Sequence, residues 1–145
     1  MTTVEEILKE KGKTVDALGP QATMMEALKI MTTHKIGAVL VIENNKILGI
    51  FSERDCVQNL AQLSECSLET PITDFMSSPV YYITPDQTLD DCMAVMTGKR
   101  LRHLPVLAGE ELVGLISIGD VVKKVLSERD ERIRDLEQLL WVNLI

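Results

Sequence analysis

Aromatic residues and cysteines are scarce in this chain, and long apolar runs are missing. One Trp, two Tyr and two Phe make up 3% of its 145 residues, too few for the stacking platform of a single-strand nucleic-acid binder. Three cysteines, Cys56, Cys66 and Cys92, show no C-x-x-C spacing, so neither a disulfide framework nor a zinc site is predicted. Apolar runs such as residues 38–42 are far too short to span a bilayer, and no membrane segment is expected.

Basic residues are outnumbered as well. Fifteen Lys and Arg against 22 Asp and Glu give a net charge of −7, whereas a general nucleic-acid surface needs a field of cations. Any phosphate must therefore meet a local cluster. The first residues, 1–6, are acidic and lack the basic and apolar regions of a secretory signal, so we expect a cytoplasmic protein.

An internal repeat relates the two halves of the chain. Displacing the sequence by 65 residues superposes 20–55 on 85–120 without a gap. Identical pairs include Pro20 and Pro85, Thr23 and Thr88, Met31 and Met96, Val41 and Val106, Gly49 and Gly114, Ser52 and Ser117, and Asp55 and Asp120. One supersecondary unit is therefore used twice.

Each copy predicts a helix, a β-hairpin and a second helix. Thr23-x-x-Glu26 and Thr88-x-x-Asp91 are capping-box patterns that begin the first helices, which run to about Thr33 and Lys99. The predicted strands are 38–42, 47–51, 104–107 and 112–117, with turns at Asn44-Asn45 and Ala108-Gly109. With a strand before each first helix, the fold class is α/β (α+β), with two pseudo-symmetric β-α-β-β-α repeats packed as one module.

The repeat also sets the expected domain organisation. We expect an N-terminal helix in 1–13, a first repeat in 14–63, a connecting segment in 64–78, a second repeat in 79–127 and a C-terminal helical tail in 128–145. The tail carries one apolar stripe, made of Ile133, Leu136, Leu139 and Leu140, which predicts a partner surface.

The repeated motif Gly-x-x-Ser-x-x-Asp gathers polar groups where a strand meets a helix. Its glycine is expected to let a ligand approach the backbone, and its serine to cap the helix or bind a phosphate at the helix N-terminus. The aspartate accepts hydrogen bonds only, which suits the vicinal hydroxyls of a ribose. Helix capping alone is the simpler interpretation of one such motif. Its recurrence in the same register favours a ligand.

The residues of this repeat resemble the CBS domain, the family named after cystathionine β-synthase. The resemblance covers about 14–127, and its most characteristic stretches are 36–41, 49–55, 102–106 and 114–120. It implies a Bateman module that binds AMP, ADP, ATP or NAD in the clefts between the two repeats. It also implies the absence of catalytic residues, a homodimer, and a regulated protein whose identity the sequence does not give.

The resemblance also assigns candidate site residues. One site would use Ser117 and Asp120, with backbone and apolar contacts to adenine from Ile36, Gly37 and Ala38, and phosphate contacts from Arg100, Arg102 and His103. The reciprocal site would use Ser52 and Asp55, walled by Ile83 and the segment from Leu101 to Leu104. Arg54 and Pro105 complete the candidate set, with Arg54 expected to reach a phosphate. Gly37 and Ala38 stand where the second repeat has Arg102 and His103, so we expect the Asp120 site to be the better one.

Simpler interpretations remain for several of these residues. The cations around residue 100 could complement the helix dipole, His103 could bond a backbone carbonyl, and Arg54 could pair with Glu53 or Asp55. Neither His34 nor His103 has a second ligand at metal spacing. Two competing functions remain, a dimerisation or protein-interaction scaffold and a sensor of S-adenosylmethionine. An enzyme acting through Cys92 or His103 is disfavoured, because the sequence shows no supporting arrangement of a nucleophile and a base.

Overall fold

The computed structural model describes residues 1–62 and 68–128. They divide into two compact units. The first-repeat unit spans Thr14–Tyr82, and the second-repeat unit combines Met1–Lys13 with the chain from Ile83 onward. The apolar stripe expected at 133–140 lies outside the described residues.

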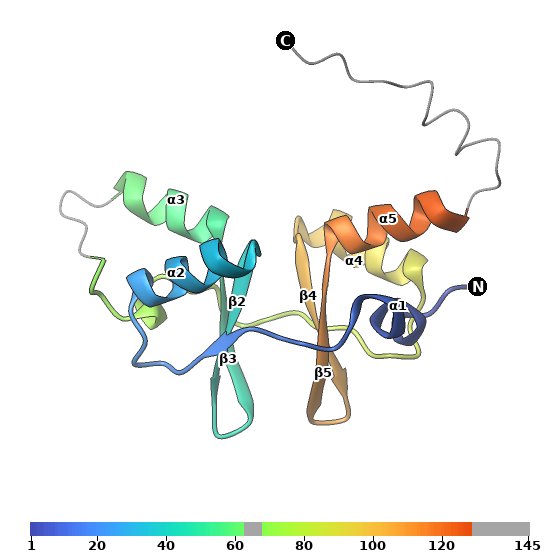
Figure 1. Ribbon diagram of the computed structural model, residues 1–145, viewed down its shortest axis with the longest axis horizontal. Helices are drawn as coiled ribbons and strands as arrows, with labels where there is room; N and C mark the ends of the chain where they lie inside the picture. Colours follow the sequence, from blue (N-terminus) through green and yellow to red (C-terminus); the bar gives the residue numbers. More distant parts are fainter. Residues whose placement is uncertain (63–67, 129–145) are drawn as a thin grey trace, which may run out of the picture. The chain divides into compact units, whose positions relative to one another are not determined.

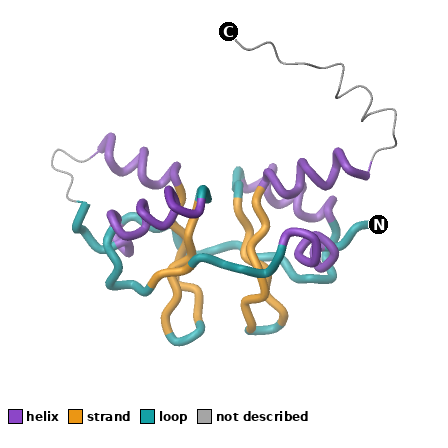
Figure 2. Tube along the Cα trace, in the orientation of Figure 1, coloured by secondary structure: helices purple, strands orange, loops and turns teal. Residues whose placement is uncertain are grey.

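The first-repeat unit is a small sheet with two helices beside it (Figures 1 and 2). Its elements are β1 (Ala17–Leu18), α2 (Met24–His34), β2 (Ala38–Glu43), β3 (Lys46–Ser52), α3 (Glu53–Gln62) and the 3₁₀ turn η1 (Ile72–Asp74). β1 runs parallel to β2, and β2 antiparallel to β3. Asn44 and Asn45 adopt φ of 52° and 62° at the hairpin turn, the left-handed pair that a tight hairpin requires.

The second-repeat unit repeats the order of helix, β-hairpin and helix. It contains α1 (Val4–Lys11), α4 (Leu89–Lys99), β4 (His103–Ala108), β5 (Glu111–Ser117) and α5 (Ile118–Glu128). The β4–β5 register, from His103 opposite Ser117 to Ala108 opposite Glu111, matches that of β2–β3. The turn falls on Gly109 and Glu110, with Gly109 at φ 65°, one residue later than the sequence predicted.

The third strand differs between the two units. In the first-repeat unit Leu40 N donates to Asp16 O at 3.1 Å, so β1 extends the sheet. The second-repeat unit has Pro105 in the place of Leu40, and proline has no N–H to donate. Only an isolated parallel bridge between Ile83 and Val106 remains there. The three-stranded sheet predicted for each repeat is therefore complete in the first-repeat unit alone.

The helix starts follow the sequence closely. Thr3, Thr23 and Thr88 each accept a hydrogen bond from the backbone N–H three residues on, and the carboxylates of Glu6, Glu26 and Asp91 accept one from the backbone N–H of the cap residue. These are complete capping boxes, worth about 0.5–2 kcal/mol each. The shorter aspartate closes the box as well as glutamate does.

Each unit's core is completed by a crossing segment, which in sequence precedes the other repeat. The two crossing segments are α1, which packs in the second-repeat unit, and residues 72–77, which pack in the first-repeat unit. In the second-repeat unit Val4, Ile7 and Leu8 of α1 are buried, and Val4 N donates to Gln87 O at 2.8 Å. In the first-repeat unit Ile72 and Phe75 join the buried cluster. The chain thus crosses between units twice.

These exchanged segments explain the two motif glycines. A Cβ on Gly114 would lie 2.5 Å from Leu8 Cδ2, and one on Gly49 would overlap Met76 Sδ. Both distances are far below van der Waals contact, so a side chain at either glycine would displace the Leu8 or Met76 side chain. The glycines make room for packing within the unit, which corrects the expectation that they serve the approach of a ligand.

Candidate functional site

The two Ser-x-x-Asp turns have the same geometry. Ser52 N and Oγ donate to Asp55 Oδ2 at 2.9 and 3.0 Å, and Asp55 N donates back to Ser52 Oγ at 3.3 Å. For Ser117 and Asp120 the same three distances are 2.8, 2.9 and 3.1 Å. The turns therefore cap α3 and α5, and the carboxylates are held in fixed orientations at two helix N-termini.

A further donor meets each carboxylate, and the sequence interpretation missed both. Ser77 Oγ donates to Asp55 Oδ1 at 2.7 Å, and Lys11 Nζ donates to Asp120 Oδ2 at 2.5 Å. Each comes from the segment that crossed over from the other repeat. Extending the repeat register upstream, where Ile7 aligns with Ile72, would have indicated that these segments also occupy equivalent places.

The Lys11 contact decides the charge state of Asp120. Partial burial raises the pKa of this carboxyl, but the hydrogen bonds from Lys11 and Ser117, with the Lys11 charge, outweigh burial and hold the pKa below its ordinary value. The side chains of Lys11 and Asp120 are 31% and 21% exposed. Asp120 is thus an ionised, oriented acceptor at neutral pH.

This depressed pKa predicts a pH dependence of stability. A carboxyl with a lower pKa in the folded state contributes stability above its unfolded pKa, near pH 4, and loses that contribution as the pH falls through the folded pKa. We expect wild type to be more stable than Asp120→Asn in urea unfolding at pH 7, and the difference to shrink at pH 3. A difference independent of pH would contradict the ion pair.

The predicted cations of the second repeat lie beside the Ser117 turn. Ile118 N, in the first turn of α5, donates to Arg102 O at 2.8 Å, and His103 is the strand partner of Ser117. Arg100 ends α4 in the left-handed conformation at φ 55°. The structure therefore brings Arg102, His103, Ser117 and Asp120 to one edge of the sheet within one unit.

The first-repeat unit has the same arrangement, with Gly37 and Ala38 in the places of Arg102 and His103. Glu53 N donates to Gly37 O at 3.0 Å, and Ala38 is the strand partner of Ser52. Ile36 and Gly37 are half-buried and Ala38 is buried. Here a small apolar edge lies next to the Ser52 turn.

The remaining candidates divide into core and surface. Ile83 and Leu104 are 0% exposed and belong to the core of the second-repeat unit, and Pro105 is buried beside them. Arg54 is exposed on α3. The assignment of 36–38 to the Asp120 site, and of Ile83 and 101–104 to the Asp55 site, stays a prediction.

Neither His34 nor Cys92 is arranged for chemistry. His34 Nδ1 lies 2.7 Å from Asp16 Oδ1, which ties α2 to the chain before β1. Burial, with the charge of Asp91, raises the pKa of the Cys92 thiol to about 11, so this core cysteine is a poor nucleophile. Within 1–62 and 68–128, no group of three or more His, Cys, Asp or Glu is placed to hold a metal ion, and no helix is long and apolar enough to cross a membrane.

Two units with the same order of elements, each ending its hairpin in a Ser-x-x-Asp turn, define a paired α/β repeat protein. The family profile described as "CBS domain" matches residues 4–62 and 72–127. The chain belongs to the CBS domain family. Each matched range begins with a crossing segment, so the family unit includes the part that packs into the other repeat's core.

Known proteins agree with this assignment. The Arabidopsis thaliana CBS domain-containing protein CBSX3, mitochondrial, is 33% identical over 144 residues, covering 93% of this chain and 70% of its own length. A solved structure of a putative signal-transduction protein with CBS domains from Burkholderia ambifaria is 42% identical, with a TM-score of 0.85 over 89% of this chain and 97% of that one. The structure of CBSX2 in complex with AMP shares the fold at 21% identity, with a TM-score of 0.69 over 88% and 98% of the two chains.

Proposed function

We propose that this chain is a regulatory module that binds an adenine nucleotide, AMP, ADP, ATP or NAD, and has no catalytic activity of its own. The observation that carries the proposal is the meeting of Arg102 and His103 with the Ser117 turn at one sheet edge. Cations, a helix N-terminus and an ionised carboxylate together match the phosphate and ribose of a nucleotide. The AMP held by CBSX2, a protein of the same fold, supports this choice of ligand.

Each polar group takes a separate part of the ligand. Asp120 accepts hydrogen bonds from the ribose hydroxyls, because an ionised carboxylate only accepts. Ser117 lies at the N-terminus of α5, where its hydroxyl and the helix dipole favour an anionic oxygen. Arg100, Arg102 and His103 meet the phosphates.

The first-repeat turn is the weaker nucleotide site in this proposal. Ser52 and Asp55 have the same geometry as Ser117 and Asp120, so ribose recognition is retained. Gly37 and Ala38 stand in the places of Arg102 and His103 beside the turn. Arg54 on α3 is then the phosphate contact of the Asp55 site, at an exposed position.

Thermal shift measurements with AMP, ADP, ATP, NAD and S-adenosylmethionine test the function. A ligand at 100 times its Kd stabilises the folded state by about 2.7 kcal/mol, which displaces the unfolding temperature clearly. We expect the phosphate-bearing nucleotides to stabilise the protein. A preference for S-adenosylmethionine would make the chain a sensor of that compound, and no shift with any ligand at millimolar concentration would contradict nucleotide binding.

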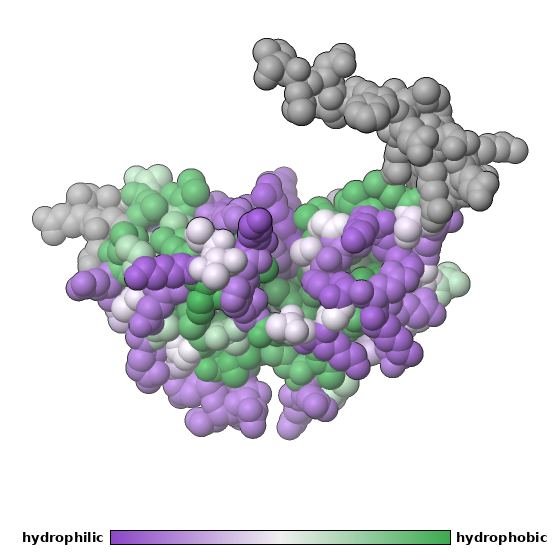
Figure 3. Space-filling view, viewed as in Figure 1, coloured by the Kyte–Doolittle hydropathy of each residue, from purple (hydrophilic) through white to green (hydrophobic). Residues whose placement is uncertain are grey.

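A second candidate function is dimerisation or contact with the regulated protein. Ile118, Val122 and Leu126 are 40–51% exposed and recur every four residues on α5, and Val57 and Leu60 are exposed on α3; apolar residues lie over both helices in Figure 3. Such a stripe favours a protein partner, and a homodimer is the occupant we expect. Val122→Glu, examined by light scattering, should then halve the mass, with Lys123→Glu on an exposed neighbouring position as the control.

A further inference from the structure

The Lys11 ammonium makes the contacts that Ser77 makes in the other unit, although the repeat register pairs Lys11 with Met76. Ser77 N donates to Ile50 O at 2.8 Å and its hydroxyl to Asp55 at 2.7 Å. Lys11 Nζ donates to Leu115 O at 2.7 Å and to Asp120 at 2.5 Å. Leu115 is the repeat equivalent of Ile50, and Asp120 that of Asp55. Ser77 uses two donors, its backbone N–H and its hydroxyl, for the strand carbonyl and the carboxylate. Lys11 uses its one ammonium group for both acceptors.

The exchange of serine for lysine changes the charge of the site. The donors that Ser52 and Ser77 offer to Asp55 are neutral, so these contacts leave the negative charge of the carboxylate in place. At the Asp120 turn the Lys11 ammonium offsets it. An uncompensated carboxylate repels a nearby phosphate, and the repulsion is stronger at a partly buried site than in water.

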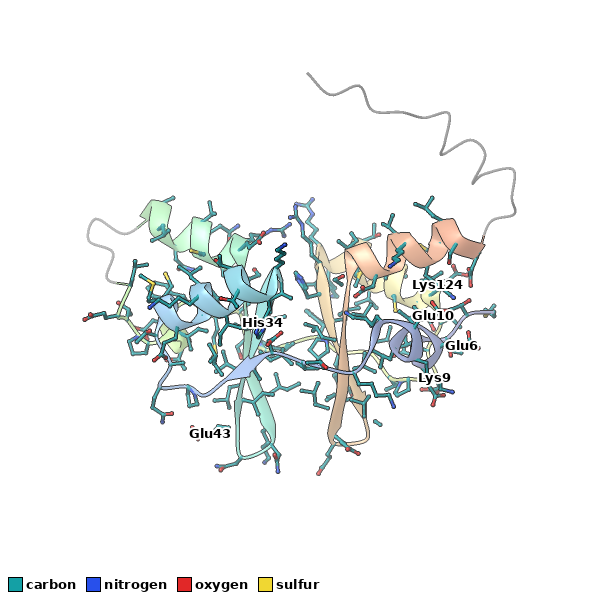
Figure 4. All side chains as sticks on the ribbon, viewed as in Figure 1. Glu6, Lys9, Glu10, His34, Glu43 and Lys124 are labelled. Atoms are coloured by element: carbon teal, nitrogen blue, oxygen red, sulfur yellow. The ribbon has the colours of Figure 1, made fainter. Side chains whose placement is uncertain are left out.

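The ammonium group is fixed rather than loosely placed. The Leu115 carbonyl holds Nζ from the strand side while Asp120 holds it from α5. Glu10, the neighbour of Lys11 on α1, faces Lys124 on α5 at 2.8 Å (Figure 4). Since Glu10 and Lys124 pair with each other, Lys11 is the cation that meets Asp120 in this part of the described structure.

Three donors on one oxygen also decide where the ligand binds. Ser117 N, Ser117 Oγ and Lys11 Nζ all meet Asp120 Oδ2. A carboxylate oxygen has about two lone-pair directions, so these donors saturate Oδ2. Ribose hydroxyls are therefore directed to Oδ1.

From this geometry we propose that Lys11 is a specificity-determining residue of the Asp120 site, which makes that site select phosphate-bearing adenine nucleotides over the neutral nucleoside. The inference rests on the proposed nucleotide function and adds to it the charge class of the ligand. Lys11 acts by neutralising Asp120 and by adding positive potential beside Arg102 and His103. At the Asp55 turn the equivalent contact comes from the neutral hydroxyl of Ser77.

Calorimetric titration of AMP and adenosine into Lys11→Met tests this selectivity. Methionine keeps most of the side chain's length and apolar body but removes the charge. We expect AMP affinity to fall about tenfold, a typical effect of removing one close charge at a binding site, and adenosine affinity to change less than about twofold. Lys11→Arg should restore most of the AMP affinity, because it restores the charge.

The matched control is Lys124→Met, which breaks the other ion pair between α1 and α5 without touching Asp120. It should leave both affinities unchanged, and circular dichroism should show all variants folded. Equal losses of AMP and adenosine affinity in Lys11→Met would show that Lys11 only supports the structure, and would overturn the proposed selectivity. Unchanged AMP affinity would overturn it as well. If the wild type binds neither compound, the proposed function itself fails. If the wild type binds AMP and Lys11→Met binds it equally well, only the role of Lys11 fails.

Discussion

Leu8→Ala is expected to lower the free energy of unfolding by about 2–5 kcal/mol, the range for removing a buried leucine side chain. Leu8 is 1% exposed, and its methyl groups lie over Gly114 on β5. Glycine has no side chain with which to fill the resulting cavity, so little relaxation is available. Although Leu8 precedes the first repeat in sequence, the damage should fall on the second.

Urea unfolding combined with amide hydrogen exchange measures both parts of this prediction. Amides of β4 and β5 should lose more protection than those of β2 and β3, because α1 packs in the core of the second-repeat unit. Lys9→Ala, at an exposed position on the same helix, is the control and should change stability little. Greater loss of protection in β2 and β3 would contradict the crossing of the chain.

Local features of this fold were predictable because their causes are local. The capping boxes at Thr3, Thr23 and Thr88 depend on residues three apart, and the hairpin at Asn44-Asn45 depends on two residues that tolerate positive φ. The repeat register then predicted that the second copy would follow the first, and β4–β5 does match β2–β3.

The crossing of the chain could not be predicted in the same way. The apolar pattern of α1 shows that one face is buried, but a periodic pattern does not say which sheet covers it. From the sequence, Gly49 and Gly114 are expected to let a ligand approach the backbone. In the fold, Met76 and Leu8 fill the space beside them. The loss of one backbone hydrogen bond at Pro105 could be predicted from the sequence, because proline has no N–H to donate.

The candidate site shows the same division between local and distant causes. Ser117 and Asp120 were found because they lie three residues apart and recur. Lys11 was missed because it is 109 residues from Asp120 in sequence, and a lysine at a helix end is ordinarily a solvated charge. Only the folded chain shows that this charge belongs to the same turn.

Asp120→Ala is expected to weaken AMP binding by about 1.5–3 kcal/mol, the value of charged hydrogen bonds left unmade. This corresponds to about a 10- to 150-fold rise in Kd, since each 1.4 kcal/mol is a factor of ten. Calorimetry on the wild type and the variant gives the ratio directly. Asp55→Ala is the matched control, because it removes the equivalent carboxylate from the first-repeat turn. Arg102 and His103 do not lie beside that turn in its unit, so the effect on AMP affinity should be smaller.

The bond to Lys11 makes Asp120→Ala a change to the fold as well as to the site. Asp120 accepts from Lys11 and from Ser117, so the variant releases the end of α1 and opens the cap of α5. Asp120→Asn separates the two effects, because its amide oxygen still accepts from Ser117 N while its charge is lost. If Asp120 binds the ribose as an ionised acceptor, Asp120→Asn loses most of the AMP affinity that Asp120→Ala loses. Full AMP affinity in Asp120→Asn would remove this carboxylate from ligand recognition and leave it the role of a cap.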